Sequence, residues 1–313
     1  MLKVAGIGEI LFDILPKGKM LGGAPANFAF HSKILGLDSN LVSAIGNDTA
    51  GTDIRQILSG MDVSTEYIQC VHFPTGTVKV TLDSMGIAKY DITENVAWDH
   101  IAWTNNNRIL ASEVDAVCFG SLAQRSKESH KSIQNFLAHT KDACLKVFDI
   151  NLRQNYFSCE IIESSLQMAN VLKLNEDELD ALKTLFDLPK SDEKALGVIL
   201  NRYKLQFIAF TQGAAGSTMI DHHDTYHCPG IPVPVKDTIG AGDSFTAAMI
   251  MGKLHNLPLS KINRLASKVA ASVCSQHGAT PIIPSSTISE LQKEIQLVNG
   301  VDSTIKTKNL LTN

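Results

Sequence analysis

A glycine-rich stretch followed by a carboxylate, DTIGAGDSF at residues 237–245, is the part of the sequence best suited to chemistry. Gly240, Ala241 and Gly242 carry little or no side chain, so their backbone N–H groups can approach an anion closely where a helix begins. The helix dipole also favours negative charge there. Asp243 follows directly and could accept a proton from an attacking hydroxyl. The stretch predicts either an anion hole beside a base for phosphoryl transfer, or an acidic residue that only caps a helix.

A second cluster, FDILPKGKMLGGAPANF, combines glycines with a carboxylate and an amide. Residues 22–25 predict a tight entry into a helix, and Asn27 would project from its first turn with both a donor and an acceptor. We expect Asp13 at the end of the first strand, so that it meets Asn27 at the carboxyl edge of a parallel sheet. A carboxylate with an amide at that edge is suited to binding a polyol. The alternative is a glycine turn with a surface asparagine.

Two common nucleotide-binding loops are not present in the sequence. The Gly-Lys pairs at residues 18–19 and 252–253 are followed by Met and Leu, so no P-loop motif occurs. The first strand is followed by GIGEIL, in which leucine replaces the last glycine of the dinucleotide-binding motif.

The composition is that of an ordinary globular protein. Of 313 residues, 44% are hydrophobic and 19% charged, and the net charge of −4 gives no electrostatic reason to expect nucleic acid or membrane partners. The N-terminus carries no cationic leader, and six cysteines are scattered singly, which is typical of reduced core thiols. We therefore expect a cytoplasmic protein.

Short apolar runs alternate with helical patterns along most of the chain, which predicts an α/β fold with a parallel sheet between helices. The expected pairs of strand and helix are 3–8 with 24–35, 114–120 with 127–139, and 145–150 with 160–169. Two segments depart from this pattern. Residues 76–91 predict an antiparallel hairpin around a Ser-Met-Gly turn, and residues 207–235 predict three strands before helices at about 241–254 and 259–276.

The motifs together resemble the signatures of the PfkB, or ribokinase-like, carbohydrate kinases. GGAPAN and DTIGAGD are similar to the family's two signatures, and GEILFDILP, YDITENVAWD and CSQHGATP look like its fructokinase branch. The likeness spans about residues 3–285, with the motifs in family order.

By this resemblance, the catalytic and sugar-binding residues lie in the two clusters. It implies that Asp243 is the base and that Gly240, Ala241 and Gly242 form the anion hole. The residues that it implies as sugar contacts are Asp13, Gly23, Asn27, Tyr90 and Arg153. Arg153 follows from FDINLR, where ribokinases more often carry a proline before the asparagine.

The resemblance also implies the cofactors ATP and Mg²⁺. NEDE is similar to the family's N-x-x-E motif, which implies that Asn175 and Glu178 organise Mg²⁺ through water, although a helix-capping role is compatible with this. TQGAAGS looks like a nucleotide turn in which Thr211, Gly213 and Gly216 contact ATP. The resemblance alone places Asp237 and Thr238 near a site for a monovalent cation such as K⁺.

These implications define one expected protein. A single domain, residues 1–313, would form a three-layer αβα sandwich with a mainly parallel sheet and a small β-sheet lid at about residues 11–20 and 69–92. The expected activity is phosphorylation of fructose to fructose 6-phosphate. The alternatives are a kinase for 2-keto-3-deoxygluconate, ribose or a nucleoside, and a non-catalytic sugar or nucleotide sensor. A homodimer through the lid is expected from the family only.

Overall fold

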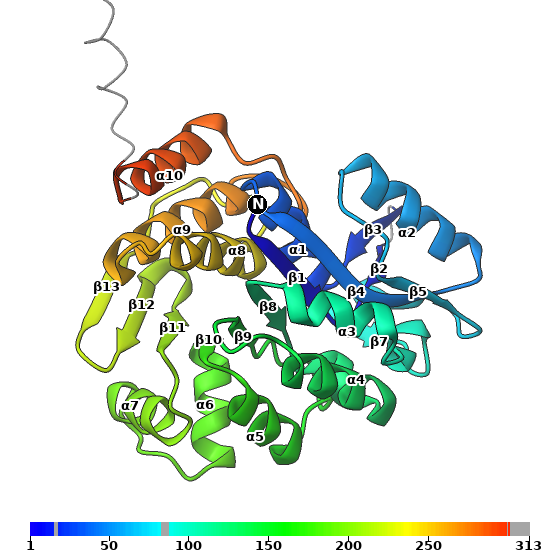
Figure 1. Cartoon of the computed structure of the whole chain (residues 1–313), viewed down its shortest axis with the longest axis horizontal. Helices are drawn as coiled ribbons and strands as arrows, with labels where there is room; N and C mark the ends of the chain where they lie inside the picture. Colours follow the sequence, from blue (N-terminus) through cyan, green and yellow to red (C-terminus); the bar gives the residue numbers. More distant parts are fainter. Residues whose placement is uncertain (16–17, 83–87, 299, 301–313) are drawn as a thin grey trace, which may run out of the picture.

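A nine-stranded, mainly parallel sheet forms the middle layer of the molecule (Figure 1). The computed structural model describes residues 1–15, 18–82, 88–298 and 300, with the backbone alone for residues 80–82 and 88–90. The strands lie in the order β13-β12-β11-β10-β9-β8-β1-β4-β5, and only the pairings of β12 are antiparallel. The strands are β1 (Lys3–Ile7), β4 (Asp38–Gly46), β5 (Ile68–Val71), β8 (Ala116–Phe119), β9 (Leu145–Asp149), β10 (Val171–Asn175), β11 (Phe207–Thr211), β12 (Gly216–Asp221) and β13 (Thr225–Pro229).

Helices cover both faces of this sheet. On one face lie α3 (Asn105–Glu113), α4 (Lys127–Ala138), α5 (Cys159–Met168), α6 (Glu176–Leu185) and α7 (Asp192–Arg202). On the other lie α1 (Ala24–Ile34), α8 (Ala241–Leu254), α9 (Leu259–Cys274) and α10 (Ser285–Val298), while α2 (Thr49–Gly60) packs beside β4. The short 3₁₀ helices are η1 (Ala97–His100), η2 (Leu122–Arg125) and η3 (Gly213–Ala215). The predicted three-layer αβα sandwich is confirmed.

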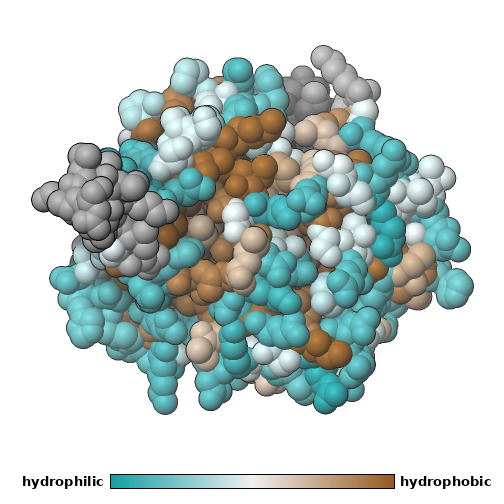
Figure 2. All heavy atoms as spheres, turned by 45° about the horizontal axis from the view of Figure 1, so that its top comes forward, coloured by the Kyte–Doolittle hydropathy of each residue, from teal (hydrophilic) through white to brown (hydrophobic). Residues whose placement is uncertain are grey.

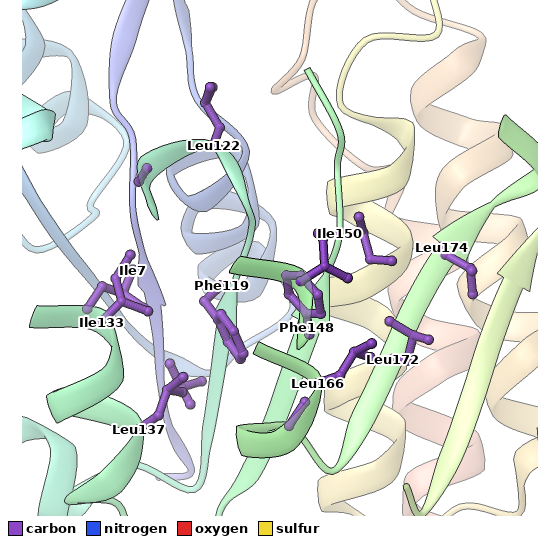
Figure 3. Close-up of a cluster of buried hydrophobic side chains, with 14 of the residues drawn as sticks. Ile7, Phe119, Leu122, Ile133, Leu137, Phe148, Ile150, Leu166, Leu172 and Leu174 are labelled. Atoms are coloured by element: carbon purple, nitrogen blue, oxygen red, sulfur yellow. The ribbon is translucent and has the colours of Figure 1, made fainter. Parts of the chain in front are cut away.

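The apolar strand sequences explain the two cores, because successive side chains of a strand point to opposite faces of the sheet. In β8, Val117 and Phe119 join the core under α4 and α5, whereas Ala116 and Cys118 join the core under α8 and α9. Figure 3 shows the first of these cores, where Phe119 and Phe148 of neighbouring strands lie side by side. Strands buried on both faces need continuous apolar runs, which is what the sequence contains.

A separate four-stranded sheet lies beside the large one, in the order β3-β2-β6-β7. It consists of two antiparallel hairpins joined by a parallel pairing of β2 with β6. The strands are β2 (Leu11–Leu15), β3 (Gly18–Gly22), β6 (Gly76–Leu82) and β7 (Ala88–Ile92). The predicted hairpin at residues 76–91 is confirmed, although its Ser-Met-Gly turn lies outside the described residues. Residues 69–71, which we expected in the lid, belong instead to β5 at the edge of the large sheet.

The other sequence predictions for the elements agree with the structure. The strands β11 to β13 and the helices α8 and α9 lie within two residues of the predicted ends, except that the third strand ends at Pro229. The six cysteines are all free, but Cys70 and Cys159 are exposed rather than core residues. Among the described residues, no helix is both long and apolar enough to cross a membrane.

Candidate active site

A large cleft lies between the two sheets and reaches the N-terminal ends of α1 and α8. Its volume is about 2010 Å³, and residues from both sheets line it. Pockets for one small ligand usually enclose about 300 to 1,000 Å³, so the cleft has room for two ligands side by side. On the face shown in Figure 2, hydrophobic residues gather toward the middle and hydrophilic residues surround them.

The two glycine clusters of the sequence meet in this cleft. Asn27, in the first turn of α1, donates a hydrogen bond of 2.8 Å from Nδ2 to Oδ2 of Asp243, in the first turn of α8. The amide oxygen of Asn27 is buried and has no hydrogen-bond partner among the described residues. A buried acceptor without a donor is costly, so this oxygen is suited to a ligand hydroxyl.

The start of α8 has the geometry of an anion site. Gly240 adopts the left-handed conformation with φ 78°, and a Cβ at this position would lie 2.2 Å from the carbonyl oxygen of Ala279. The first backbone bond of the α-helical type runs from Ser244 to Gly240, and the N–H groups of Gly242 and Asp243 have no acceptor in the described part of the chain. These two N–H groups are therefore available to an anion.

Asp243 has an unusual protonation behaviour for an aspartate. Burial, and after it the negative charge of Asp149, raise the pKa of Asp243 to about 6. The hydrogen bond from Asn27 and the charges of Lys173 and Arg153 act in the opposite direction. A carboxylate with a pKa closer to neutrality is a better proton acceptor than an exposed one and is still ionised at pH 7.

The expected position of Asp13 was wrong, although it lies in the cleft. Asp13 is not at the end of the first strand but in the middle of β2, in the small sheet, and lines the cleft with Gly23 and Arg153. Burial raises the pKa of Asp13, and the nearby charge of Arg153 lowers it. The side chain of Tyr90 lies outside the described residues, so its predicted sugar contact stays a prediction.

Glu9 is the side chain that does lie just beyond the first strand, and sequence reasoning missed it. It is 4% exposed, lines the cleft, and accepts a 3.3 Å hydrogen bond from the N–H of Ala24 at the start of α1. Its other carboxylate oxygen has no partner among the described residues, and burial raises the pKa of Glu9 to about 7. The available signal was a lone acid directly after an apolar strand.

Asn175 and Glu178 form a capping box at the start of α6. Oδ1 of Asn175 accepts from the N–H of Glu178 at 2.9 Å, and Oε2 of Glu178 accepts from the N–H of Asn175 at 2.8 Å. Both residues also line the cleft, and each oxygen keeps a free lone pair. Burial raises the pKa of Glu178, while the charge of Lys173 lowers it. Two hard oxygen ligands fit a cation such as Mg²⁺ that keeps most of its water.

A buried ion pair lies under the anion site, and sequence reasoning missed it as well. Nζ of Lys173 in β10 donates to Oδ1 of Asp149 at 2.8 Å, and Oγ1 of Thr246 in α8 donates to Oδ2 of Asp149 at 2.8 Å. Burial alone would lower the pKa of Lys173, but the carboxylates of Asp149 and Glu178 raise it above its usual value. The signal in the sequence was a lysine within the apolar run VLKLN.

The predicted nucleotide turn joins β11 to β12 at another part of the cleft. Thr211, Gly213 and Gly216 all line the cleft, and Gly213 and Gly216 have φ values of 52° and 107°. A Cβ on Gly216 would lie 2.1 Å from the carbonyl oxygen of Cys228, so hairpin packing alone also requires this glycine.

The residues predicted near a monovalent cation lie in the loop before α8. The carboxylate of Asp237 accepts from the backbone N–H groups of Ile239 and Gly278, both at 3.0 Å. Thr238 is exposed and lines the cleft. The Asp237 carboxylate thus braces the loop that carries Gly240.

Comparison with known proteins came to one family. The sequence pattern of the pfkB family carbohydrate kinases matches residues 18–286. A fructokinase of Salmonella typhimurium is 30% identical over 81% of this chain and 85% of its own. The crystal structure of an uncharacterized sugar kinase from Pyrococcus horikoshii is 28% identical, covers 95% of this chain and 99% of its own, and superposes with a TM-score of 0.80. The same kinase has a crystal structure in complex with ATP, with a TM-score of 0.78, 28% identity, and coverage of 94% and 99%.

Proposed function

The chain belongs to the pfkB family of carbohydrate kinases, and from this premise we propose that it transfers the γ-phosphoryl group of ATP to fructose, giving fructose 6-phosphate. The fructokinase of Salmonella typhimurium supports fructose as the acceptor, and the ATP complex of the Pyrococcus horikoshii kinase supports ATP as the donor.

One observation carries the proposal: the hydrogen bond between Asn27 and Asp243 beside two free N–H groups. A phosphoryl acceptor needs a base at its hydroxyl and donors at the phosphoryl oxygens, and the two must lie on either side of one phosphorus atom. The first turn of α8 provides both within consecutive residues, 242 and 243.

Each side chain has a distinct task in this mechanism. Nδ2 of Asn27 fixes one oxygen of Asp243, so that the other oxygen accepts the proton of the sugar hydroxyl. The backbone N–H groups of Gly240, Ala241 and Gly242 stabilise the charge on the phosphoryl oxygens during transfer. Asp13, Gly23 and Arg153 line the same cleft and bind the remaining sugar hydroxyls, together with Asn27 and Tyr90.

The nucleotide would occupy the other half of the cleft. Thr211, Gly213 and Gly216 would contact ATP from the turn between β11 and β12. Asn175 and Glu178 would hold Mg²⁺ through water, and the ion would neutralise charge on the phosphates. The loop with Asp237 and Thr238 is the proposed site for a monovalent cation such as K⁺, because its oxygens border the anion site.

The small sheet is proposed to act as a lid over the sugar. Closure over the acceptor would exclude water and so suppress hydrolysis of ATP. Ile14 in β2 is 37% exposed, which supports a homodimer through the outer face of this sheet. Light scattering tests the dimer directly, since a monomeric mass in solution would refute it. Six free cysteines support a cytoplasmic location.

The alternatives differ in substrate or in the absence of turnover. Other acceptors are 2-keto-3-deoxygluconate, ribose or a nucleoside, since the side chain contacts that select the sugar come from the small sheet and Arg153. A non-catalytic sugar or nucleotide sensor has no need of a base beside an anion site. The raised pKa of Asp243 therefore favours an enzyme.

The test is ADP release from Mg-ATP over a panel of acceptors. The panel contains fructose, ribose, 2-keto-3-deoxygluconate, adenosine and fructose 6-phosphate. Fructose should give a kcat/KM at least about tenfold above that of each other acceptor. A higher value for another sugar would replace fructose as the substrate, and ATP binding without turnover of any acceptor would favour the sensor.

A further inference from the structure

Lys173 is a charged side chain in the cleft to which the proposed mechanism assigns no role. It lies within the parallel strand β10, is 7% exposed, and lines the cleft. Its ammonium donates to Asp149, whose other oxygen accepts from Thr246 in α8. The hydroxyl of Thr246 also contacts the carbonyl oxygen of Gly242 at 3.1 Å. The ion pair is thus connected to the first turn of α8.

The ammonium of Lys173 packs directly against the anion site. A Cβ on Gly242 would lie 2.9 Å from Nζ of Lys173, so the missing side chain of this glycine leaves the space that the ammonium occupies. The positive end of the α8 dipole opposes a cation there, and burial of any charge is costly. An ion pair that served only stability would be better placed away from a helix N-terminus. A site for an anion gains from the same arrangement, because both positive charges then attract the ligand.

We propose that Lys173 supplies the fixed positive charge of the anion site, attracting the phosphoryl group during transfer, and that Asp149 positions its ammonium. This inference rests on the proposed function. Asp149 holds Nζ beside Gly242 with Thr246 as its second partner, so the ammonium needs no reorganisation when the phosphoryl group arrives. A merely structural ion pair would predict that both charges can be removed together without loss of turnover.

The first experiment removes the charge and measures two quantities. For Lys173→Met we expect kcat to fall by about 10²- to 10³-fold, as on loss of one donor to a developing anion, with KM for the sugar changed by less than about threefold. The affinity for Mg-ATP, measured by calorimetry without sugar, should fall at least about tenfold, while that for Mg-ADP should change by less than about threefold. The matched control is Lys146→Met, which removes a half-buried lysine from the amino end of the neighbouring strand β9 and should leave both quantities within about twofold.

A second variant separates the charge from folding. Lys173→Met leaves Asp149 as a buried carboxylate without its partner and could unfold the protein. The double variant Lys173→Met/Asp149→Asn removes both charges and should regain thermal stability relative to the single variant, yet kcat should stay at least about 10²-fold below the parent. Recovery of kcat to within tenfold in a folded double variant would overturn the inference.

The nucleotide measurement keeps the inference distinct from the proposed function. If the parent protein phosphorylates none of the acceptors, the proposed function fails, and the ratio of Mg-ATP to Mg-ADP affinity alone decides the role of Lys173. An unchanged ratio in Lys173→Met would then overturn the inference, and a ratio reduced at least about tenfold would support it.

Discussion

Asp243 owes its chemical character to the residues packed around it. Burial and the charge of Asp149 raise the pKa of Asp243 to about 6, and Asn27 fixes one of its oxygens. The carboxylate was predictable from the sequence because it follows a glycine-rich stretch. Its neighbours Glu9, Asp149 and Lys173 were not assigned roles, because a charged residue beside or within an apolar run does not reveal which other strands will lie next to it.

At the residue scale, Asp243→Asn should abolish turnover without loss of binding. An amide cannot accept the proton of the hydroxyl but fills the same space, so kcat should fall by at least about 10³-fold while Mg-ATP affinity stays within about threefold. Steady-state rates and calorimetry measure the two effects. A kcat within tenfold of the parent would remove Asp243 as the base.

The same pKa predicts the acid limb of the pH profile. The base must be deprotonated, so kcat/KM should rise with pH and level off above a midpoint near 6. Rates of the free enzyme between pH 4.5 and 8.5 at saturating Mg-ATP would show this limb. A midpoint at or below 4, as for an exposed aspartate, would contradict the burial of this carboxylate as the cause.

Glu9 predicts a pH dependence of stability. The folded-state pKa of about 7 lies above the ordinary value of 4.5, so the folded protein binds a proton more tightly than the unfolded chain. This contribution to stability is fully present below pH 4.5 and is lost as pH rises through 7. Glu9→Gln stays neutral, so its free energy of unfolding should gain on that of the parent between pH 5 and 8, by up to about 3 kcal/mol. Urea unfolding at both pH values tests this, and a difference independent of pH would contradict it.

At the element scale, the N-terminus of α8 determines the site. The sequence predicted this helix closely, because GAGD is followed by a long apolar run and the glycines mark the point where the helix begins. The assignment of Asp13 failed for a reason at the same scale. A strand of the small sheet follows β1 after only three residues, so a chain position near the first strand did not place Asp13 on the large sheet.

Gly240 provides the test of this element. Gly240→Ala puts a Cβ 2.2 Å from the carbonyl oxygen of Ala279 and forces a side chain into a left-handed conformation. We expect a loss of at least about 2 kcal/mol in the free energy of unfolding and a weakened affinity for Mg-ATP. The matched control is Gly197→Ala in α7, where no atom lies within 4 Å of the new Cβ and stability should rise by up to about 1 kcal/mol. Equal effects of the two changes would contradict the account.

At the scale of the whole molecule, the cleft depends on how the small sheet is attached to the large one. The guanidinium of Arg125 stacks 4.0 Å above the ring centroid of Trp98 and donates to both oxygens of Asp99, at 2.8 and 2.9 Å. It also donates to the carbonyl oxygen of Thr93, directly after the small sheet, at 2.7 Å. No local pattern in the sequence indicates this attachment, since it joins segments about 30 residues apart.

Arg125→Met should loosen this attachment. It leaves the buried carboxylate of Asp99 without its cation, so the free energy of unfolding should fall by about 3 to 5 kcal/mol. Urea denaturation measures the loss, and the exposed Arg108→Met on α3 serves as the control, with an expected change below about 0.5 kcal/mol. A loss of less than 1 kcal/mol in Arg125→Met would show that the small sheet is held by other contacts.

The most direct test of the central claim is single-turnover transfer of the labelled γ-phosphoryl group from ATP to fructose, with the parent and Asp243→Asn compared at enzyme excess. The account predicts labelled fructose 6-phosphate from the parent and a rate at least about 10³-fold lower from the variant, with Mg-ATP bound by both. Equal rates of transfer, or no transfer to fructose by a parent protein that binds Mg-ATP, would contradict it.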